Sequence, residues 1–139
     1  MKITIRNLQK KIPVYPTRIK KPILKALKSE GLRELGEITL CFVTEKEMRR
    51  LNTKYHKTNA STDVLAFNLG KGIAGKGELA DIIISTDAAM RNAKIFKTTP
   101  AFELSLYALH GVLHLLGYKD RSAKEIRLMR KKETLYANS

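Results

Sequence analysis

The chain has 139 residues, of which 43% are hydrophobic and 29% are charged, and this balance excludes an intrinsically disordered protein. Lys and Arg outnumber Asp and Glu by 27 to 13, which gives a formal net charge of +14. So one-sided a charge favours a polyanionic partner, most commonly nucleic acid, although a basic surface can also serve solubility alone.

The first part of the chain is predicted to mix strands and helices. Alternating or strand-like apolar residues predict strands at 3–5, 37–44, 62–68 and 78–85. A helix is expected over 16–30, followed by Gly31, and another begins at the capping box Thr44-Glu45-Lys46-Glu47 and runs to about residue 57. The glycine-rich segment 70–77 lacks the ending of a Walker A motif, so a hairpin connection is favoured over a phosphate cradle.

The second part is predicted to be helical. Helices are expected over about 86–96 and 100–116, the latter starting at Thr99-Pro100 and ending before Gly117. A capping box at Ser122-Ala123-Lys124-Glu125 predicts a last helix that runs to about Tyr136. Its expected packed face holds Ile126, Met129 and Leu135, and its charged face holds Lys124, Arg127, Arg130, Lys131 and Lys132.

This order of elements predicts an α+β fold, in which a mixed sheet of about four strands is covered by helices, with a central buried helix at 100–116. We expect a single domain spanning residues 1–139. The N-terminal residues do not resemble a secretory signal, and the longest uncharged run, 104–118, is too short to span a bilayer. The sequence therefore predicts a cytoplasmic protein without a membrane anchor.

The predicted buried helix carries two histidines. His110 and His114 are four residues apart, so they lie on one helix face with Cβ atoms about 5–6 Å apart. At that spacing both rings can hold one zinc ion at about 2.0–2.1 Å. For a bare pair of this kind, two core histidines bonded to backbone or water are the more common alternative.

The residues after the pair favour a metal. Gly117 follows His114 by three positions and Asp120 follows Gly117 by three, which gives the pattern H-x3-H-x2-G-x2-D. This is the spacing of the metzincin zinc motif, whose third ligand is ordinarily histidine. Aspartate is also a zinc ligand, and three protein ligands leave one position open for water, as in catalytic sites. We therefore predict one Zn²⁺ held by His110, His114 and Asp120, although nickel or iron would also suit these ligands.

The residue after the first histidine argues against a metallopeptidase. A zinc peptidase of this type needs glutamate there as its general base, and this chain has Gly111. Cleavage of a phosphodiester can instead rely on the metal and on stabilisation of charge at phosphate oxygens. Together with the basic charge, this makes RNA the favoured substrate. Aromatic residues are only 6% of the chain, which predicts recognition of backbone and shape more than base stacking.

The run His110-Gly111-Val112-Leu113-His114-Leu115-Leu116-Gly117-Tyr118 resembles the signature of the YbeY family, and residues 51–55, 61–67 and 77–85 also resemble that family. The resemblance covers roughly residues 40–135. It implies an α+β domain and one zinc ion. It also implies a zinc-dependent endoribonuclease that acts on single strands in rRNA maturation and ribosome quality control, with RNA and a ribosomal subunit as partners.

The chain departs from the family pattern at three positions. The family's third zinc ligand is histidine where this chain has Asp120, so we expect a less positive site and a higher pKa for bound water. The family has a phosphate-holding arginine where this chain has His56, followed by Lys57. These two residues are the candidates for phosphate binding, but neither has the bidentate fork of arginine. Ser61 stands where the family prefers proline.

Two classes of function remain open from the sequence. One is a zinc endoribonuclease. The other is a non-catalytic ribosome assembly factor in which the metal serves structure, and a metallopeptidase is a weaker third. If RNA is the substrate, basic residues expected around the cleft would add affinity that falls with salt; they are Arg49, Arg50, Lys54, Lys71 and Lys76.

Overall fold

Four strands and five helices make up the part of the chain that the computed structural model describes, which is residues 2–30, 35–56, 63–71 and 78–137. In chain order they are β1 (Lys2–Asn7), α1 (Pro16–Glu30), β2 (Leu35–Val43), α2 (Glu45–His56), β3 (Val64–Lys71), β4 (Glu78–Ser85), α3 (Thr86–Phe96), α4 (Pro100–Leu115) and α5 (Ala123–Ala137). The predicted elements are confirmed in type and order. Within the described ranges, no helix is both long enough and apolar enough to cross a bilayer.

The strands form one sheet in the order β1-β2-β4-β3. The pairs β1–β2 and β2–β4 are parallel, and β3 runs antiparallel to β4. This confirms the predicted mixed sheet of four strands. It also confirms that β3 and β4 pair as a hairpin would, while residues 72–77 between them lie outside the described part.

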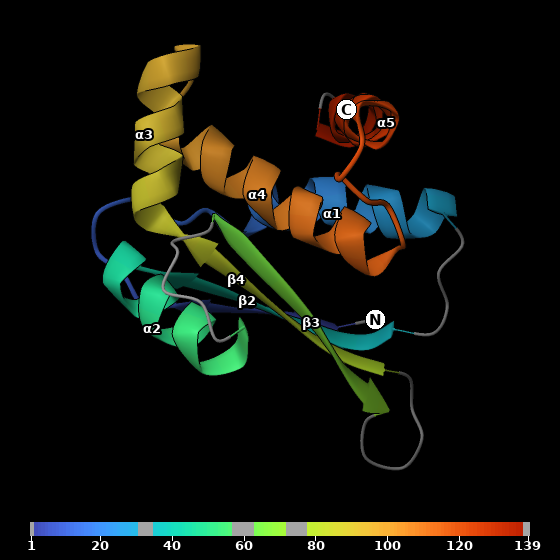
Figure 1. Cartoon of the computed structure of the whole chain (residues 1–139), viewed down its shortest axis with the longest axis horizontal. Coiled ribbons are helices and arrows are strands. Elements are labelled where there is room, and N and C mark those ends of the chain that lie inside the picture. The colour runs from blue at the N-terminus through green and yellow to red at the C-terminus, as the bar shows by residue number, and fades with distance from the viewer. Residues whose placement is uncertain (1, 31–34, 57–62, 72–77, 138–139) are drawn as a thin grey trace.

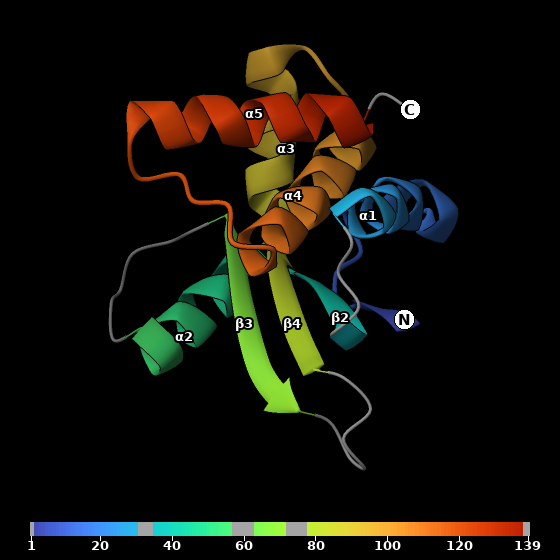
Figure 2. The ribbon, with the colours of Figure 1, turned by 90° about the vertical axis from the view of Figure 1, so that its right-hand side faces the viewer.

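Helices cover both faces of the sheet (Figures 1 and 2). On one face Leu40, Ile82 and Ile84 pack in a core with residues of α1 and α4. On the other face, Val43, Leu65 and Ile83 pack with Met48 of α2. Because successive side chains of a strand point to opposite faces, β4 buries Ile82 and Ile83 in different cores.

Helix α4 approaches the sheet closely because one of its residues has no side chain. A Cβ atom at Gly111 would lie 2.5 Å from Cγ2 of Ile82 and 3.2 Å from Cγ1 of Val64. Both methyls are branched directly from Cβ, so neither can move away easily. The glycine therefore sets how near α4 lies to β4 and β3.

A proline inside α1 frees a backbone carbonyl that α4 binds. Pro22 has no N–H, so the carbonyl of Arg18 loses its intrahelical partner. The hydroxyl of Ser105 on α4 donates to that carbonyl at 3.2 Å. The carbonyl that Pro22 leaves without a partner in α1 thus forms a hydrogen bond between the two helices.

The C-terminal end of α1 holds both α5 and the segment that precedes it. The Glu30 carboxylate accepts hydrogen bonds from the hydroxyls of Tyr118 and Tyr136, each at 2.5 Å, and from the ammonium of Lys132 at 3.3 Å. These bonds lower the pKa of Glu30, with Tyr118 the largest contributor. One carboxylate therefore joins α1, α5 and the turn after α4.

The last helix begins as predicted and packs differently from the prediction. The Ser122 and Glu125 side chains accept hydrogen bonds from each other's backbone N–H, at 3.1 and 2.9 Å, which is a complete capping box. Met129 is buried as expected, but Leu135 is 54% exposed and Ile126 is 36% exposed. The prediction of these two as packed residues was wrong, because α5 rests on the domain through Met129 and Tyr136.

We predict that Gly111→Ala lowers the free energy of unfolding. The new methyl would overlap Ile82, and overpacking costs about 1–3 kcal/mol, which outweighs the gain of roughly 1 kcal/mol in helix propensity. Urea denaturation measures the change. In an Ile82→Ala background the nearest methyl is gone and only Cγ1 of Val64 remains at 3.2 Å, so the same substitution should cost less there than in the native background. A stabilising effect of Gly111→Ala in the native background would contradict the packing argument.

We predict that Glu30→Gln costs about 1–3 kcal/mol at pH 7, because hydrogen bonds to an ionised group are replaced by weaker ones. A lowered folded pKa contributes stability above the ordinary glutamate pKa of 4.5, and this contribution is lost as the pH falls through the folded pKa. In a series of unfolding measurements at decreasing pH, the difference from wild type should therefore shrink as the pH falls below 4.5 and through the folded pKa of Glu30. Glu47→Gln is the matched control, since its exposed pair with Arg50 should contribute under about 1 kcal/mol. A loss that persists unchanged in acid would refute the assignment.

Candidate metal centre

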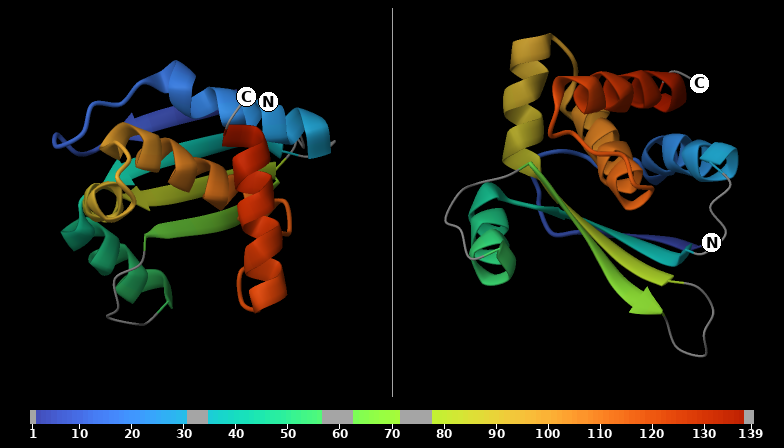
Figure 3. Two further views of the ribbon diagram at one scale, coloured as in Figure 1. Left: turned by 90° about the horizontal axis from the view of Figure 1, so that it is seen from above. Right: turned by 45° about the vertical axis from the view of Figure 1, so that its right-hand side comes forward.

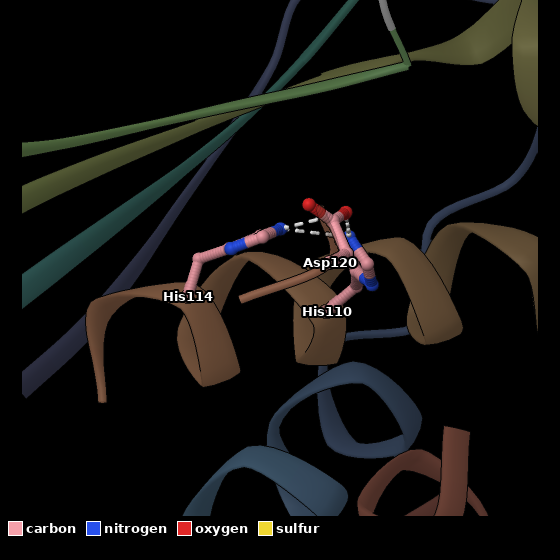
Figure 4. A group of neighbouring side chains, drawn as sticks. All are labelled: His110, His114 and Asp120. Atoms are coloured by element: carbon pink, nitrogen blue, oxygen red, sulfur yellow. Dashed lines mark hydrogen bonds and ion pairs between the residues drawn. The ribbon is translucent and has the colours of Figure 1, made fainter. Parts of the chain in front are cut away.

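The structure brings together the three residues of the predicted metal site (Figure 4). His110 and His114 extend from adjacent turns of α4, and Asp120 reaches them from the segment after the helix. The two Nε2 atoms lie 3.0 Å apart. Oδ2 of Asp120 is 3.4 Å from Nε2 of His110 and 3.3 Å from Nε2 of His114.

The return of the chain toward the histidines begins at Gly117. Its φ of +101° lies in the region that favours glycine. The N–H of Gly117 donates to the His114 carbonyl and that of Tyr118 to the Leu113 carbonyl, both at 3.0 Å. These bonds close the helix, and the Tyr118 hydroxyl is bound to Glu30. Asp120 follows two residues later and faces the histidines.

The three donor atoms fit a single small cation. A tetrahedral ion with bonds of about 2.0–2.1 Å needs donors about 3.3–3.4 Å apart, close to the 3.0, 3.3 and 3.4 Å found here. Two imidazole lone pairs and a carboxylate oxygen at these distances repel each other unless a proton or a cation lies between them. The rings bond to side chains here, unlike the alternative of core histidines bonded to backbone.

A fourth residue, Glu133 of α5, orients His110. Its Oε1 lies 2.9 Å from Nδ1 of His110, so Nδ1 carries the proton and Nε2 presents its lone pair to the triad. A carboxylate behind a ligating histidine is a common arrangement in metal sites. Burial disfavours the charged form of His110, but the hydrogen bond and charge of Glu133, with those of Asp120, raise the pKa of His110 above its ordinary value.

The triad opens into a cleft of about 490 Å³, which Asp63, Leu106, Tyr107 and Glu133 also line. The side chains of His110, His114 and Asp120 are 24%, 30% and 44% exposed, so a ligand can reach them. Burial, with smaller contributions from neighbouring charges, raises the pKa of Tyr107 to about 12. Tyr107 therefore stays protonated near neutral pH, and its hydroxyl is bonded to Asn92 of α3.

The other predicted site residues either lie outside the described residues or do not line the cleft. Lys57 lies outside the described residues, and His56 ends α2 with a side chain that also lies outside them, so phosphate binding by either stays a prediction. Arg49 and Arg50 do not line the cleft. They lie on α2, across the sheet from α4 (Figure 1), and pair with Glu45 and Glu47.

Sequence reasoning missed Glu133 and Asp63. Glu133 follows the buried Met129 by four residues, so it lies on the inward face of α5. A carboxylate at such a position was the signal that could have marked it. Asp63 precedes β3 and belongs to one of the stretches that resemble the YbeY family, but no spacing motif links it to the histidines.

Comparison with known proteins places the chain in one family. The family model described as Endoribonuclease YbeY matches residues 4–139. Two curated relatives named Endoribonuclease YbeY come from Pelotomaculum thermopropionicum and Syntrophus aciditrophicus. The first is 38% identical over 96% of this chain and 93% of its own length. The second is 36% identical over 96% of this chain and 86% of its own length.

A solved structure also matches. The solution structure of TM1509 from Thermotoga maritima superposes with a TM-score of 0.64 at 26% identity, covering 98% of this chain and 87% of that chain. The fold, the family model and the relatives therefore agree with the resemblance first seen around the two histidines. This chain belongs to the Endoribonuclease YbeY family.

Proposed function

We propose that this protein is a zinc-dependent endoribonuclease that cleaves single-stranded RNA during rRNA maturation, with the ribosomal subunit as its setting. The observation that carries the proposal is the convergence of three donor atoms of His110, His114 and Asp120 in an open cleft. The relatives that match over most of the chain are named endoribonucleases, which supports this reaction over other hydrolyses.

We propose that His110, His114 and Asp120 hold the metal. When bound, a zinc ion supplies Lewis acidity, which lowers the pKa of water and draws charge from a phosphate oxygen. Two residues of the chain prepare the site for the metal and substrate. Glu133 orients the His110 ring, and Tyr107, which lines the cleft, stays protonated near neutral pH. Asp120 makes the site less positive than three histidines would, so we expect weaker Lewis acidity.

The basic charge of the chain supports RNA as the substrate. A chain of net charge +14 attracts a polyanion over long distances, and that attraction weakens as salt rises. We propose that His56 and Lys57 contribute phosphate contacts beside the cleft. His56 ends α2 and Lys57 follows it in the sequence, six residues before Asp63, which lines the cleft, and this proximity in sequence supports the assignment.

The surroundings of Gly111 argue against peptide hydrolysis. The position that holds the general base in zinc peptidases is buried against Ile82 and Val64, so even a glutamate could not stand there without moving the helix. A peptidase would have to take its base from elsewhere in the cleft. The nuclease proposal has no such requirement, because stabilisation of phosphate charge is its main need.

We predict that His114→Ala abolishes RNA cleavage and lowers bound zinc well below the one ion per chain expected for wild type. Two ligands hold zinc far more weakly than three. Elemental analysis after gel filtration measures the metal, and a labelled single-stranded RNA measures cleavage. His56→Ala is the matched control for metal content, since it removes an imidazole that the proposal places outside the triad.

The same experiment separates the nuclease from a metal-stabilised assembly factor. A nuclease should keep its fold and most of its RNA affinity in His114→Ala while losing cleavage. If wild type with full zinc cleaves no RNA and His114→Ala unfolds, the assembly factor is favoured. Cleavage at the wild-type rate by zinc-free His114→Ala would overturn the proposal.

We predict that Glu133→Gln weakens zinc binding about 10–100-fold, the usual effect of removing the carboxylate behind a ligating histidine. The amide has nearly the same shape, so packing is kept while His110 loses its charged partner. Competition with a chromophoric chelator measures the affinity, and Thr134→Ala on the exposed side of α5 is the control. Thermal unfolding of the metal-free proteins should differ little. Unchanged zinc affinity would show that Glu133 does not position His110 for the metal.

A further inference from the structure

A larger cavity adjoins the metal cleft. It has a volume of about 620 Å³ and lies between α3, α4 and α5, the three helices that meet on one side of the sheet (Figure 3). His110, Asp120 and Glu133 line both this groove and the metal cleft. A ligand in the groove would therefore lie beside the metal site, against residues that also line the metal cleft.

The groove exposes aromatic and aliphatic side chains. Phe96 at the end of α3 is 64% exposed, and Phe102 in the first turn of α4 is 41% exposed. Ile126, which the sequence predicts to be packed, lies on the groove and is 36% exposed. Exposing several apolar side chains together to water is unfavourable, and apolar patches of this kind commonly mark binding sites.

Polar groups also face the groove. Glu103 is buried to 3% exposure, and the Thr98 hydroxyl donates to its Oε2 at 3.0 Å. Asn92 and Arg130 line the groove as well. An apolar surface with a few hydrogen-bonding groups and a nearby cation is the combination that accepts a nucleobase, since a base has flat apolar faces, a polar edge and an adjoining phosphate.

We propose that this groove is a nucleobase subsite, which binds one base of the RNA strand whose phosphate lies in the metal cleft. Phe96 and Phe102 provide the stacking surface, and Arg130, which lines the groove and not the metal cleft, is placed to bind a second phosphate of the strand. The volume is within the range of small-molecule sites. The inference rests on the proposed action on RNA. It also modifies the expectation from composition, because two of the four phenylalanines of the chain are gathered at this groove.

The test uses the zinc-loaded protein and a fluorescent single-stranded RNA oligonucleotide with 2′-O-methyl groups, which keeps its bases and phosphates. We expect Phe96→Ala and Phe102→Ala each to weaken binding about tenfold in anisotropy titrations, the effect of losing one stacked base. Phe96→Tyr should keep wild-type affinity because it keeps the ring. Ile95→Ala is the matched control, since Ile95 is 67% exposed on the same helix and does not line the groove.

A second measurement removes the base instead of the ring. A series of oligonucleotides with one abasic nucleotide at successive positions should show one position at which wild type loses affinity and Phe96→Ala loses no more. If both alanine variants bind like Ile95→Ala and no abasic position matters, the subsite is overturned. If the phenylalanines and one base prove coupled while wild type cleaves no unmodified RNA, the subsite stands and the nuclease proposal fails.

Discussion

The contact between α4 and the sheet at Gly111 constrains the rest of the structure. With no Cβ at this position, the helix lies close against Ile82 and Val64, and any larger residue there would collide with the Ile82 methyl. The neighbouring His110 and the following His114 are thereby directed to the side of α4 that α5 and the segment after Gly117 approach. The same contact accounts for the missing peptidase base. One glycine thus sets how close the helix lies to the sheet and leaves no room for the peptidase base.

The second constraint is that Asp120 must return to the helix it has just left. Gly117 reverses the chain, but reversal alone does not fix a carboxylate to within a few tenths of an ångström. Tyr118 is bound by Glu30 at the end of α1, and Glu30 also binds Tyr136 and Lys132 of α5. The helix that supplies Glu133 and the segment that supplies Asp120 are therefore held by the same carboxylate. The triad depends on three elements far apart in the chain, although its residues lie within eleven positions.

A feature of this structure could be predicted from the sequence when it depends on residues close together in the chain. The ends of α4 and α5 were predictable because Thr99-Pro100, Gly117 and the Ser122 capping box act within one helical turn. The pairing of His110 with His114 on one helix face was predictable for the same reason, and the spacing of Gly117 and Asp120 indicated the third ligand, although the position of its carboxylate also depends on distant contacts. Glu133 was not, since its place opposite His110 depends on how α5 crosses α4, and nothing in the local sequence encodes that crossing. Leu135 was assigned to the packed face for want of the same information. The groove at Phe96 and Phe102 likewise exists only once three helices are assembled.

The charges of the molecule and of its cleft are opposite in sign, and this links the metal to the substrate. The chain as a whole is strongly basic, whereas Asp63, Asp120 and Glu133 line the cleft and Glu103 lies in the adjoining groove. Long-range attraction would bring RNA to the surface, but a phosphate would meet carboxylates at the triad itself. A divalent cation held there would offset two of these three negative charges and place a positive ion where the phosphate must sit, while the basic surface elsewhere would stay unchanged. On this view the cation would do more than activate the reaction, because it would also supply the positive charge that lets a phosphate of a bound strand approach these carboxylates.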